Sequence, residues 1–364
     1  KERRMADVDF TRRLFLSGAA AAPVVAAASE RIAEFIPPPQ RIRITTANAS
    51  SVVPPPRYSP EEVRQIEQQG KDVRLTIPAD ADELNKVLPE VDVIFGAINA
   101  EMFARAKKLR WLQATEAGVD RLLFPELVKS DVVVTNMQRV FAPIISESVI
   151  GMMMCLARGY ISTYFPLFQK RTWKPNRDLV EMDSKTMGIV GMGGIGSATA
   201  FRAHYGFNMR ILATDAKPMP KPVFVDTLRE PEWFMEMVPQ VDVLVSCVPS
   251  TPKTVRMFNQ QVFRAMKKTA YFINVSRGTV VDQPALARAL KEGEIAGAAL
   301  DVTDPEPLPP DNELWDCPNL MITDHTSGFA PERRIRLMAL LAENVRRYAN
   351  GLPLMNVVDK ERGY

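Results

Sequence analysis

The stretch Lys185-Thr-Met-Gly-Ile-Val-Gly-Met-Gly-Gly-Ile-Gly-Ser-Ala-Thr-Ala200 decides the fold. Its apolar start predicts a strand and its small-residue end predicts a helix, with Gly191, Gly193 and Gly196 between them in the pattern G-x-G-x-x-G. These glycines permit the tight turn, the approach of a pyrophosphate and the packing of helix on strand, while the helix N-terminus offers free N–H groups to phosphates. The stretch therefore predicts a dinucleotide site in a doubly wound α/β domain.

An acidic residue follows this site at the spacing expected of a ribose-binding carboxylate. Residues 209–214 predict a second strand, and Asp215 comes directly after it, nineteen residues beyond Gly196. A carboxylate at this place can accept hydrogen bonds from the adenine ribose and repels the 2′-phosphate of NADP. We therefore expect NAD as the cofactor, although Lys217 nearby supplies an opposing charge.

Composition indicates a globular chain of two domains. Of 364 residues, 46% are apolar and 24% are charged, and the formal net charge is only +3. No basic run interleaved with aromatic residues appears beyond the N-terminus, so we expect no nucleic-acid partner. Three cysteines without a C-x-x-C pair do not form a disulfide framework, and two histidines leave few arrangements for a metal, so none is expected.

The N-terminal residues have the pattern of an export signal. Residues 1–28 combine a charged lead, Thr-Arg-Arg-Leu-Phe-Leu at 11–16, a short alanine-rich apolar stretch and an Ala-x-Ala exit at 26–28. This is similar to a twin-arginine signal, which predicts a periplasmic or otherwise exported protein, and the stretch is too short for a comfortable membrane span. The alternative is an alanine-rich helix retained by a cytoplasmic enzyme. Residues 29–40, which end in three prolines, predict a linker.

The next part of the chain alternates strand and helix patterns at a pace typical of a parallel α/β sheet of the flavodoxin type. The predicted strands are 41–46, 73–77, 91–95, 111–114 and 132–135, and the predicted helices are 60–69, 80–88 and 100–108.

Two patterns in this part have an ordinary interpretation and a functional one. The loop Thr115-Glu-Ala-Gly-Val-Asp-Arg121 can expose successive N–H groups to an anion, but its chemistry alone favours an ordinary turn. Residues 144–159 predict a helix that is apolar nearly all round. Its run of three methionines favours a core or subunit-interface helix over a binding surface, and Cys155 among them is most simply a buried hydrophobe.

Beyond the glycine turn the alternation continues with nearly continuous apolar strands, which indicates a sheet covered on both faces. The predicted strands are 241–247, 270–275, 296–300 and 320–323, with a helix at 283–292. Ligands of such sheets lie beyond the carboxyl ends of the strands, so polar residues at those ends are the candidate site.

Three chemically suited residues occupy those ends. Arg277 follows the strand ending at Val275, Glu306 lies shortly after the next strand, and His325 follows the last one. An arginine grips a carboxylate at two points, a histidine can pass a proton to a carbonyl oxygen, and a glutamate raises the pKa of the histidine and orients it. Singly they could be a surface salt bridge, a loop acid and a capping residue. His204, inside the helix after the turn, is expected to be a surface or packing residue.

Together these motifs resemble the D-isomer-specific 2-hydroxyacid dehydrogenase family, over residues 41–355. The resemblance rests on four motifs: the glycine turn, Asn274-Val-Ser-Arg-Gly278 with Val281-Asp282, Leu300-Asp-Val with Glu306-Pro307, and Leu314-Trp315 leading to His325. The resemblance implies a Rossmann NAD-binding domain (155–328) inserted in a flavodoxin-like substrate domain (41–154 plus 329–364). Helix 331–348 would return to the substrate domain, with hinges near 155 and 328 and closure that expels water.

The resemblance also implies roles for single residues. Arg277 would bind the substrate, His325 would be the general acid and base, and Glu306 would be its partner. Asp301 would hold the nicotinamide carboxamide and Asp215 the adenosine ribose. The N–H groups of Ala117, Gly118 and Val119 would cradle the substrate carboxylate. The remaining predicted cofactor contacts are Gly194, Ile195, Val248, Pro249, Thr254, Val275, Ser276, Arg277 and His325.

Three positions bear on the substrate. Glu116 stands where the family usually has a small or neutral residue, and an anion there disfavours an anionic substrate. Asp324 replaces the usual proline before His325 and could shift the pKa of that histidine. Formate-oxidising relatives carry glutamine in place of Glu306, which argues against that branch.

The sequence thus predicts an exported, NAD-dependent reductase of small 2-keto acids, with a homodimer as the family expectation. One alternative is a nucleotide-sensing module of the same family without turnover. Another is an oxidoreductase of a different small anion such as phosphite. Because free NAD is scarce outside the cytoplasm, an exported enzyme is expected to carry its cofactor tightly bound.

Overall fold

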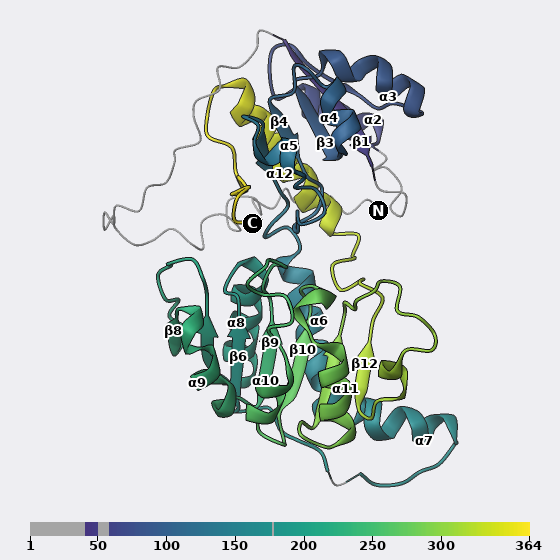
Figure 1. The fold of residues 1–364 in the computed structure, drawn as a ribbon, viewed down its shortest axis with the longest axis vertical. Helices are drawn as coiled ribbons and strands as arrows, with labels where there is room; N and C mark the ends of the chain where they lie inside the picture. The colour runs from purple at the N-terminus through teal and green to yellow at the C-terminus, as the bar shows by residue number, and fades with distance from the viewer. Residues whose placement is uncertain (1–40, 50–57, 177) are drawn as a thin grey trace, which may run out of the picture.

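The computed structural model describes residues 41–49, 58–176 and 178–364. The predicted signal at 1–28 and linker at 29–40 lie outside these residues. The described chain forms two α/β bodies, one built on a five-stranded sheet and one on a seven-stranded sheet (Figure 1). We call them the five-stranded and the seven-stranded domain.

The five-stranded sheet is parallel throughout, in the order β2-β1-β3-β4-β5. Its strands are β1 (Ile42–Asn48), β2 (Val73–Thr76), β3 (Val93–Ala97), β4 (Trp111–Gln113) and β5 (Val133–Thr135). Between them lie α2 (Pro60–Glu67), α3 (Ala81–Val87), α4 (Ala100–Arg105) and α5 (Pro125–Val128). Ser59 and Asn99 each cap their helix through a side-chain oxygen, which satisfies a free N–H group at the start of α2 and of α4.

The seven-stranded sheet is also parallel, in the order β12-β11-β10-β9-β6-β7-β8. Its strands are β6 (Thr186–Val190), β7 (Arg210–Thr214), β8 (Thr227–Arg229), β9 (Val243–Ser246), β10 (Tyr271–Asn274), β11 (Gly297–Leu300) and β12 (Leu320–Ile322). Its helices are α8 (Gly194–Phe207), α9 (Phe234–Met237), α10 (Gln260–Ala265) and α11 (Gln283–Lys291). Short 3₁₀ turns occupy Leu88–Glu90, Pro231–Trp233, Val238–Gln240, Gly278–Val280 and Glu313–Asp316.

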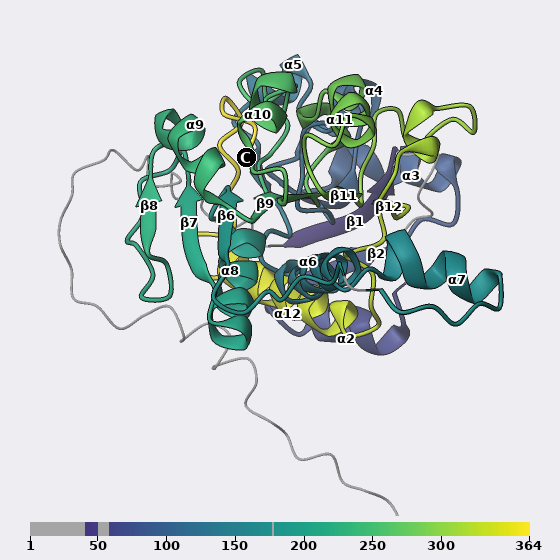
Figure 2. The same cartoon turned by 90° about the horizontal axis from the view of Figure 1, so that it is seen from below.

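Helices cover both faces of each sheet, which confirms the doubly wound prediction. In the five-stranded domain α2 packs on one face and α3 and α5 on the other. In the seven-stranded domain α8 lies on one face and α10 and α11 on the opposite one, as Figure 2 shows. Each sheet therefore separates two buried apolar clusters, and its strands are buried on both sides.

Two long helices connect the domains. α6 (Ala142–Ala157) starts at the junction and α12 (Arg333–Ala349) returns to the five-stranded domain, where its buried face packs on that sheet. The boundary expected at residue 154 falls inside α6. The buried side chains of this helix pack with those of α8 in the seven-stranded domain, so by packing most of α6 sits there.

Beyond α6 the chain forms an arm that the sequence patterns did not indicate. This arm, residues 160–173, contains a π-helical turn (Tyr160–Tyr164) and α7 (Phe165–Gln169), and it exposes Phe165, Phe168 and, beyond α7, Trp173. In the described part of the chain no single helix is long and apolar enough to cross a membrane. The bent pair of α6 and residues 160–169 passes that test by length and composition alone.

Candidate active site

The glycine turn has a geometry that only glycine allows at two of its positions. Gly191 follows β6 with φ +95°, and a Cβ there would lie 2.7 Å from the carbonyl oxygen of Cys247. A Cβ on Gly196 would lie 2.0 Å from the carbonyl oxygen of Gly191. A Cβ on Gly193, by contrast, would meet nothing within 4 Å. The turn is therefore closely packed at Gly191 and Gly196 and open at Gly193, next to the N–H groups that begin α8. This arrangement fits a bound pyrophosphate.

Asp215 lies against this turn, as predicted for a ribose-binding acid. Its carboxylate accepts hydrogen bonds from the Met192 N–H (2.6 Å) and the Lys217 N–H (2.7 Å). Two backbone donors thus fix a negative charge at the end of β7, beside the open side of the glycine turn.

The charge of Lys217 is engaged by the C-terminal segment. Its Nζ lies 4.3 Å from the centre of the Tyr364 ring, and it donates to the Tyr364 carbonyl oxygen at 3.5 Å. Burial lowers the pKa of Lys217, and the nearby carboxylate of Asp215 opposes that shift. The lysine that could receive a 2′-phosphate therefore already has an aromatic partner from the other domain.

Arg277 extends from the loop after β10 toward the five-stranded domain. Asn274 holds this loop, because its side chain donates to the Arg277 carbonyl (2.9 Å) and accepts from the Ser276 N–H (3.1 Å). The guanidinium packs on the predicted anion loop: a Cβ on Gly118 would lie 1.6 Å from Arg277 Nη2. The structure thus brings the predicted substrate-binding arginine and the predicted substrate-binding loop together.

An acid that the sequence analysis did not single out joins Arg277. Asp120 Oδ1 accepts from Arg277 Nε at 3.2 Å and lies 3.1 Å from Nη2, with both side chains about one-quarter exposed. The pair spans the two domains. An anion bound at this guanidinium would therefore share it with Asp120.

Glu306 and His325, the residues predicted to act as an acid–base pair, lie within hydrogen-bonding distance of each other. His325 Nδ1 lies 3.1 Å from Glu306 Oε2, and Glu306 Oε1 accepts from the Thr303 N–H at 3.2 Å. The hydrogen bond that His325 donates to Glu306 raises the pKa of His325, and partial burial opposes this. Burial by itself would raise the pKa of Glu306, but the hydrogen bond and charge of His325, the Thr303 N–H and the charge of Arg121 together outweigh burial, and the pKa is lowered. Both directions favour the imidazolium–carboxylate form.

Asp301 holds the backbone of His325 through a hydrogen bond. His325 has φ +61°, and its N–H donates to the Asp301 carbonyl oxygen at 2.8 Å. The buried Asp301 carboxylate accepts from Thr323 Oγ1 (2.7 Å), the Ser327 N–H (3.1 Å) and the Ser327 hydroxyl. A carboxylate accepts about four hydrogen bonds, so Asp301 retains one acceptor position for a carboxamide. Thr323 and Ser327 were not predicted, although both flank His325 in sequence.

The remaining predicted contacts lie in the loops after β9 and β10, in the loop after β4 of the five-stranded domain and at the start of α8. Val248, Pro249 and Thr254 belong to the loop after β9, in which Thr254 Oγ1 donates to the Pro249 carbonyl at 2.6 Å. Val275 and Ser276 are buried after β10. Ala117 and Val119 flank Gly118, and Ile195 follows Gly194 in the first turn of α8. His204 lies within α8 and its ring stacks edge-on against Tyr205.

The two departures from the family pattern lie on the surface. Glu116 is exposed, and its carbonyl oxygen accepts from the Met137 N–H. Asp324 is exposed and accepts from the Thr326 hydroxyl at 2.7 Å. In the described part of the chain no group of three or more His, Cys, Asp or Glu side chains could hold a metal ion.

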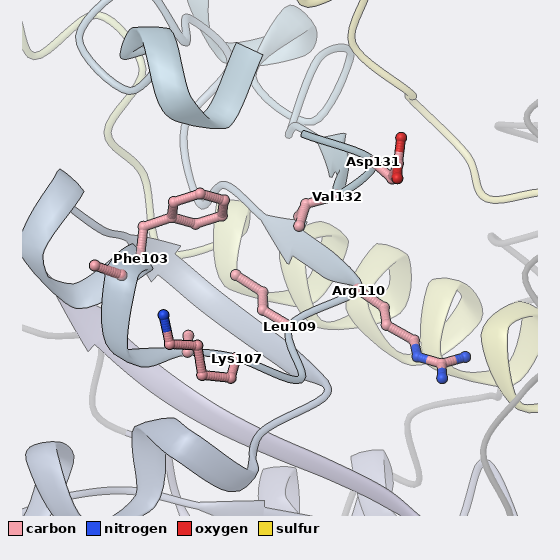
Figure 3. A pocket seen from close by; sticks show the side chains of 8 residues that line it. Phe103, Lys107, Leu109, Arg110, Asp131 and Val132 are labelled. Atoms are coloured by element: carbon pink, nitrogen blue, oxygen red, sulfur yellow. The ribbon is translucent and has the colours of Figure 1, made fainter. Parts of the chain in front are cut away.

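A separate hollow of about 480 Å³ lies on the five-stranded domain (Figure 3). It is bordered by the end of α4 and by residues just before β4 and β5, among them Leu109, Arg110 and Val132. These are the amino ends of the strands, opposite to the edge where ligands of parallel sheets bind. The hollow is therefore not part of the site described above.

Comparison with known proteins identifies the class to which this site belongs. Residues 150–327 match the family model described as D-isomer specific 2-hydroxyacid dehydrogenase, NAD binding domain. The glyoxylate reductase of Korarchaeum cryptofilum is 35% identical over 285 residues, which are 74% of this chain and 82% of that protein. The glyoxylate reductase of Thermococcus kodakarensis is 34% identical, over 83% of this chain and 89% of that protein.

Solved structures agree. A D-isomer specific 2-hydroxyacid dehydrogenase from Xanthobacter autotrophicus, in complex with NADPH and MES, has a TM-score of 0.76 at 26% identity and covers 89% of this chain and 100% of its own. An NADPH-dependent glyoxylate/hydroxypyruvate reductase from Sinorhizobium meliloti, in complex with NADP and sulfate, has a TM-score of 0.75 at 26% identity with the same coverage.

The chain is an NAD(P)-binding oxidoreductase with a Rossmann domain. It belongs to the D-isomer-specific 2-hydroxyacid dehydrogenase family, which confirms the resemblance drawn from its motifs.

Proposed function

We propose that this enzyme reduces a small 2-keto acid of the glyoxylate or hydroxypyruvate kind, with NADH as the hydride donor. The observation that carries the proposal is the His325–Glu306 pair, which lies with Arg277 at the same strand ends as the glycine turn. The names of the relatives support the substrate class, since they are glyoxylate reductases or glyoxylate/hydroxypyruvate reductases.

The residues have distinct tasks in this reaction. The bound dinucleotide supplies a hydride to the carbonyl carbon. Arg277 binds the substrate carboxylate, because its guanidinium lies on the Gly118 loop and offers paired N–H donors. His325, kept protonated by Glu306, donates a proton to the oxygen that becomes the hydroxyl. In the oxidation direction His325 takes the proton back.

NAD is proposed over NADP because the Asp215 carboxylate is fixed at the ribose end by two backbone N–H groups. A 2′-phosphate would face this charge at close range, while Lys217, a cation near Asp215, is engaged with Tyr364. Two of the solved relatives hold NADPH or NADP, so the proposal sets this chain apart from them.

Turnover across a substrate panel tests the function. We expect glyoxylate or hydroxypyruvate to be reduced with a kcat/KM at least about tenfold higher for NADH than for NADPH. Phosphite with NAD should give no NADH. Binding of NADH without turnover of any keto acid would instead support a sensing module, and oxidation of phosphite would support the other alternative.

We also propose a homodimer, supported by the exposed aromatic side chains of the arm. Phe168 is 81% exposed and Trp173 is 99% exposed. Exposing large apolar side chains to water is unfavourable for a monomer, and such surface marks an interface. Sedimentation of the parent chain should give the mass of two chains. The double variant Phe168→Ser, Trp173→Ser should sediment as one, and an unchanged mass would contradict this assignment of the interface.

Export with a tightly bound cofactor remains a proposal that rests on the pattern of residues 1–28. Fractionation of cells that express the full chain should place it outside the cytoplasm, and an Arg12→Lys, Arg13→Lys variant should stay inside. Protein purified from the exported fraction should release a dinucleotide on denaturation. Nucleotide-free protein in that fraction would contradict loading before export.

A further inference from the structure

Arg139, in the five-stranded domain, lies directly on the glycine turn of the seven-stranded domain. A Cβ built on Gly194 would lie 2.9 Å from Arg139 Cγ, 3.0 Å from its Cα and 3.3 Å from its backbone N. Gly194 is the first residue of α8, whose opening N–H groups have no partner within the helix. Arg139 therefore approaches the phosphate-binding end of α8 from the opposite domain.

The backbone of Arg139 is held in a conformation that arginine rarely adopts. Its φ is +72°, in the left-handed region that is costly for residues with a side chain. Glycine would fit this backbone without strain. A strained non-glycine residue beside a ligand site points to a use for its side chain.

Fold stability alone also does not explain the side chain of Arg139. The residue is exposed, and within residues 41–49, 58–176 and 178–364 its side chain makes no hydrogen bond or ion pair. A cation at a helix N-terminus is repelled by the positive end of the helix dipole. Only two atoms, Cδ and Nε, separate the Cγ that touches Gly194 from the guanidinium carbon. An anion between the turn and this guanidinium would relieve the repulsion on both sides.

We infer that Arg139 is a cofactor-binding residue that donates from the five-stranded domain to the pyrophosphate of the dinucleotide. The inference rests on the proposed dinucleotide function and assigns one residue outside the Rossmann domain to it. It also makes cofactor binding depend on contact between the domains, because the pyrophosphate is held on one side by α8 and on the other by Arg139.

Binding measurements with an uncharged variant test this role. Arg139→Met keeps methylene groups against Gly194 and removes the charge, Arg139→Lys keeps a charge, and Arg171→Met is the matched control. Arg171 is likewise an exposed arginine at positive φ, 49°, but it lies in the arm. Dissociation constants for NADH and ADP-ribose are measured by fluorescence titration and competition, with adenosine as the phosphate-free competitor.

Loss of a charge-assisted hydrogen bond predicts about tenfold to hundredfold weaker binding of NADH and ADP-ribose to Arg139→Met. Adenosine should bind as it does to the parent, Arg139→Lys should recover most of the affinity, and Arg171→Met should bind NADH like the parent. Saturating NADH should raise the melting temperature of Arg139→Met less than that of the parent.

Equal NADH affinity of Arg139→Met and the parent would overturn the inference while leaving the reductase proposal in place. Equal weakening of adenosine and ADP-ribose would also overturn it, because that pattern indicates a disturbed turn rather than a lost phosphate contact. A parent chain that binds neither NADH nor NADPH would contradict the proposed function itself, and the inference with it.

Discussion

At the scale of single residues, the proposed chemistry depends on how the protein sets the charge of His325. Glu306 lies 3.1 Å from its Nδ1, and this hydrogen bond raises the pKa of His325 against the effect of burial. A raised pKa keeps the imidazolium present to higher pH. The proton donor of the proposed reduction therefore persists to pH values at which an isolated histidine would have lost its proton.

Replacing Glu306 tests this dependence. In Glu306→Gln the pKa of His325 should fall, so the fraction of imidazolium at neutral pH falls and reduction slows by about 10²-fold or less. The alkaline limb of kcat/KM against pH for keto-acid reduction should move to lower pH. Glu313→Gln, which breaks the exposed pair with Lys291 in the same domain, is the control and should leave the limb in place. An unmoved limb in Glu306→Gln would contradict the pairing.

At the scale of secondary-structure elements, the β6–α8 unit rests on Gly196. Its missing Cβ leaves room for the Gly191 carbonyl oxygen, 2.0 Å from where that atom would be. Gly196→Ala should separate helix from strand, lower stability by about 2–4 kcal/mol and abolish NADH binding. Gly206→Ala in the same helix meets nothing within 4 Å and should be neutral or stabilising by up to about 1 kcal/mol. Urea unfolding and NADH titration of both variants measure the contrast, which equal effects would contradict.

A partly buried ion pair joins α2 to α12. Arg334 contacts both carboxylate oxygens of Glu62, at 2.6 and 2.9 Å, and this contact lowers the pKa of Glu62 to about 2. Because the folded-state pKa is depressed, the stabilisation is present above the unfolded pKa near 4.5 and is lost as pH falls toward about 2.

Glu62→Gln should therefore destabilise the protein at pH 7, and the difference from the parent should shrink as the pH is lowered through this window. Urea unfolding at several pH values between 7 and 3 measures it. Glu61→Gln, an exposed neighbour on the same helix, is the control and should behave like the parent. A difference that stays constant with pH would show that the pair does not act through the charge of Glu62.

At the scale of the whole molecule, the sequence predicts what is local and misses what joins the domains. Both sheets, the glycine turn and Asp215 follow from patterns within a few tens of residues. Asp120 and Arg277 are 157 residues apart, and neither residue carries a local signal of the other. The contact of Arg139 with Gly194 is similarly set by the packing of two domains, which periodicity and motif spacing do not describe.

A single methyl group added at Gly118 should disturb the contact between the domains. In Gly118→Ala the new Cβ would displace the Arg277 guanidinium, since it would lie 1.6 Å from Nη2. The KM for the keto acid should rise by about tenfold or more while the dissociation constant of NADH stays near that of the parent. Gly151→Ala in α6 has open space and serves as the control. Weakened NADH binding with an unchanged substrate KM would contradict the assignment of Gly118 and Arg277 to the substrate.

The proposed function centres on proton transfer by His325 coupled to hydride transfer at these strand ends. The most direct measurement is single-turnover reduction of glyoxylate and hydroxypyruvate by NADH, followed by loss of NADH absorbance in the parent and in His325→Ala. We predict that the variant binds NADH like the parent and reduces either acid about 10²- to 10⁴-fold more slowly. Reduction by His325→Ala at a rate within a few-fold of the parent would contradict the account.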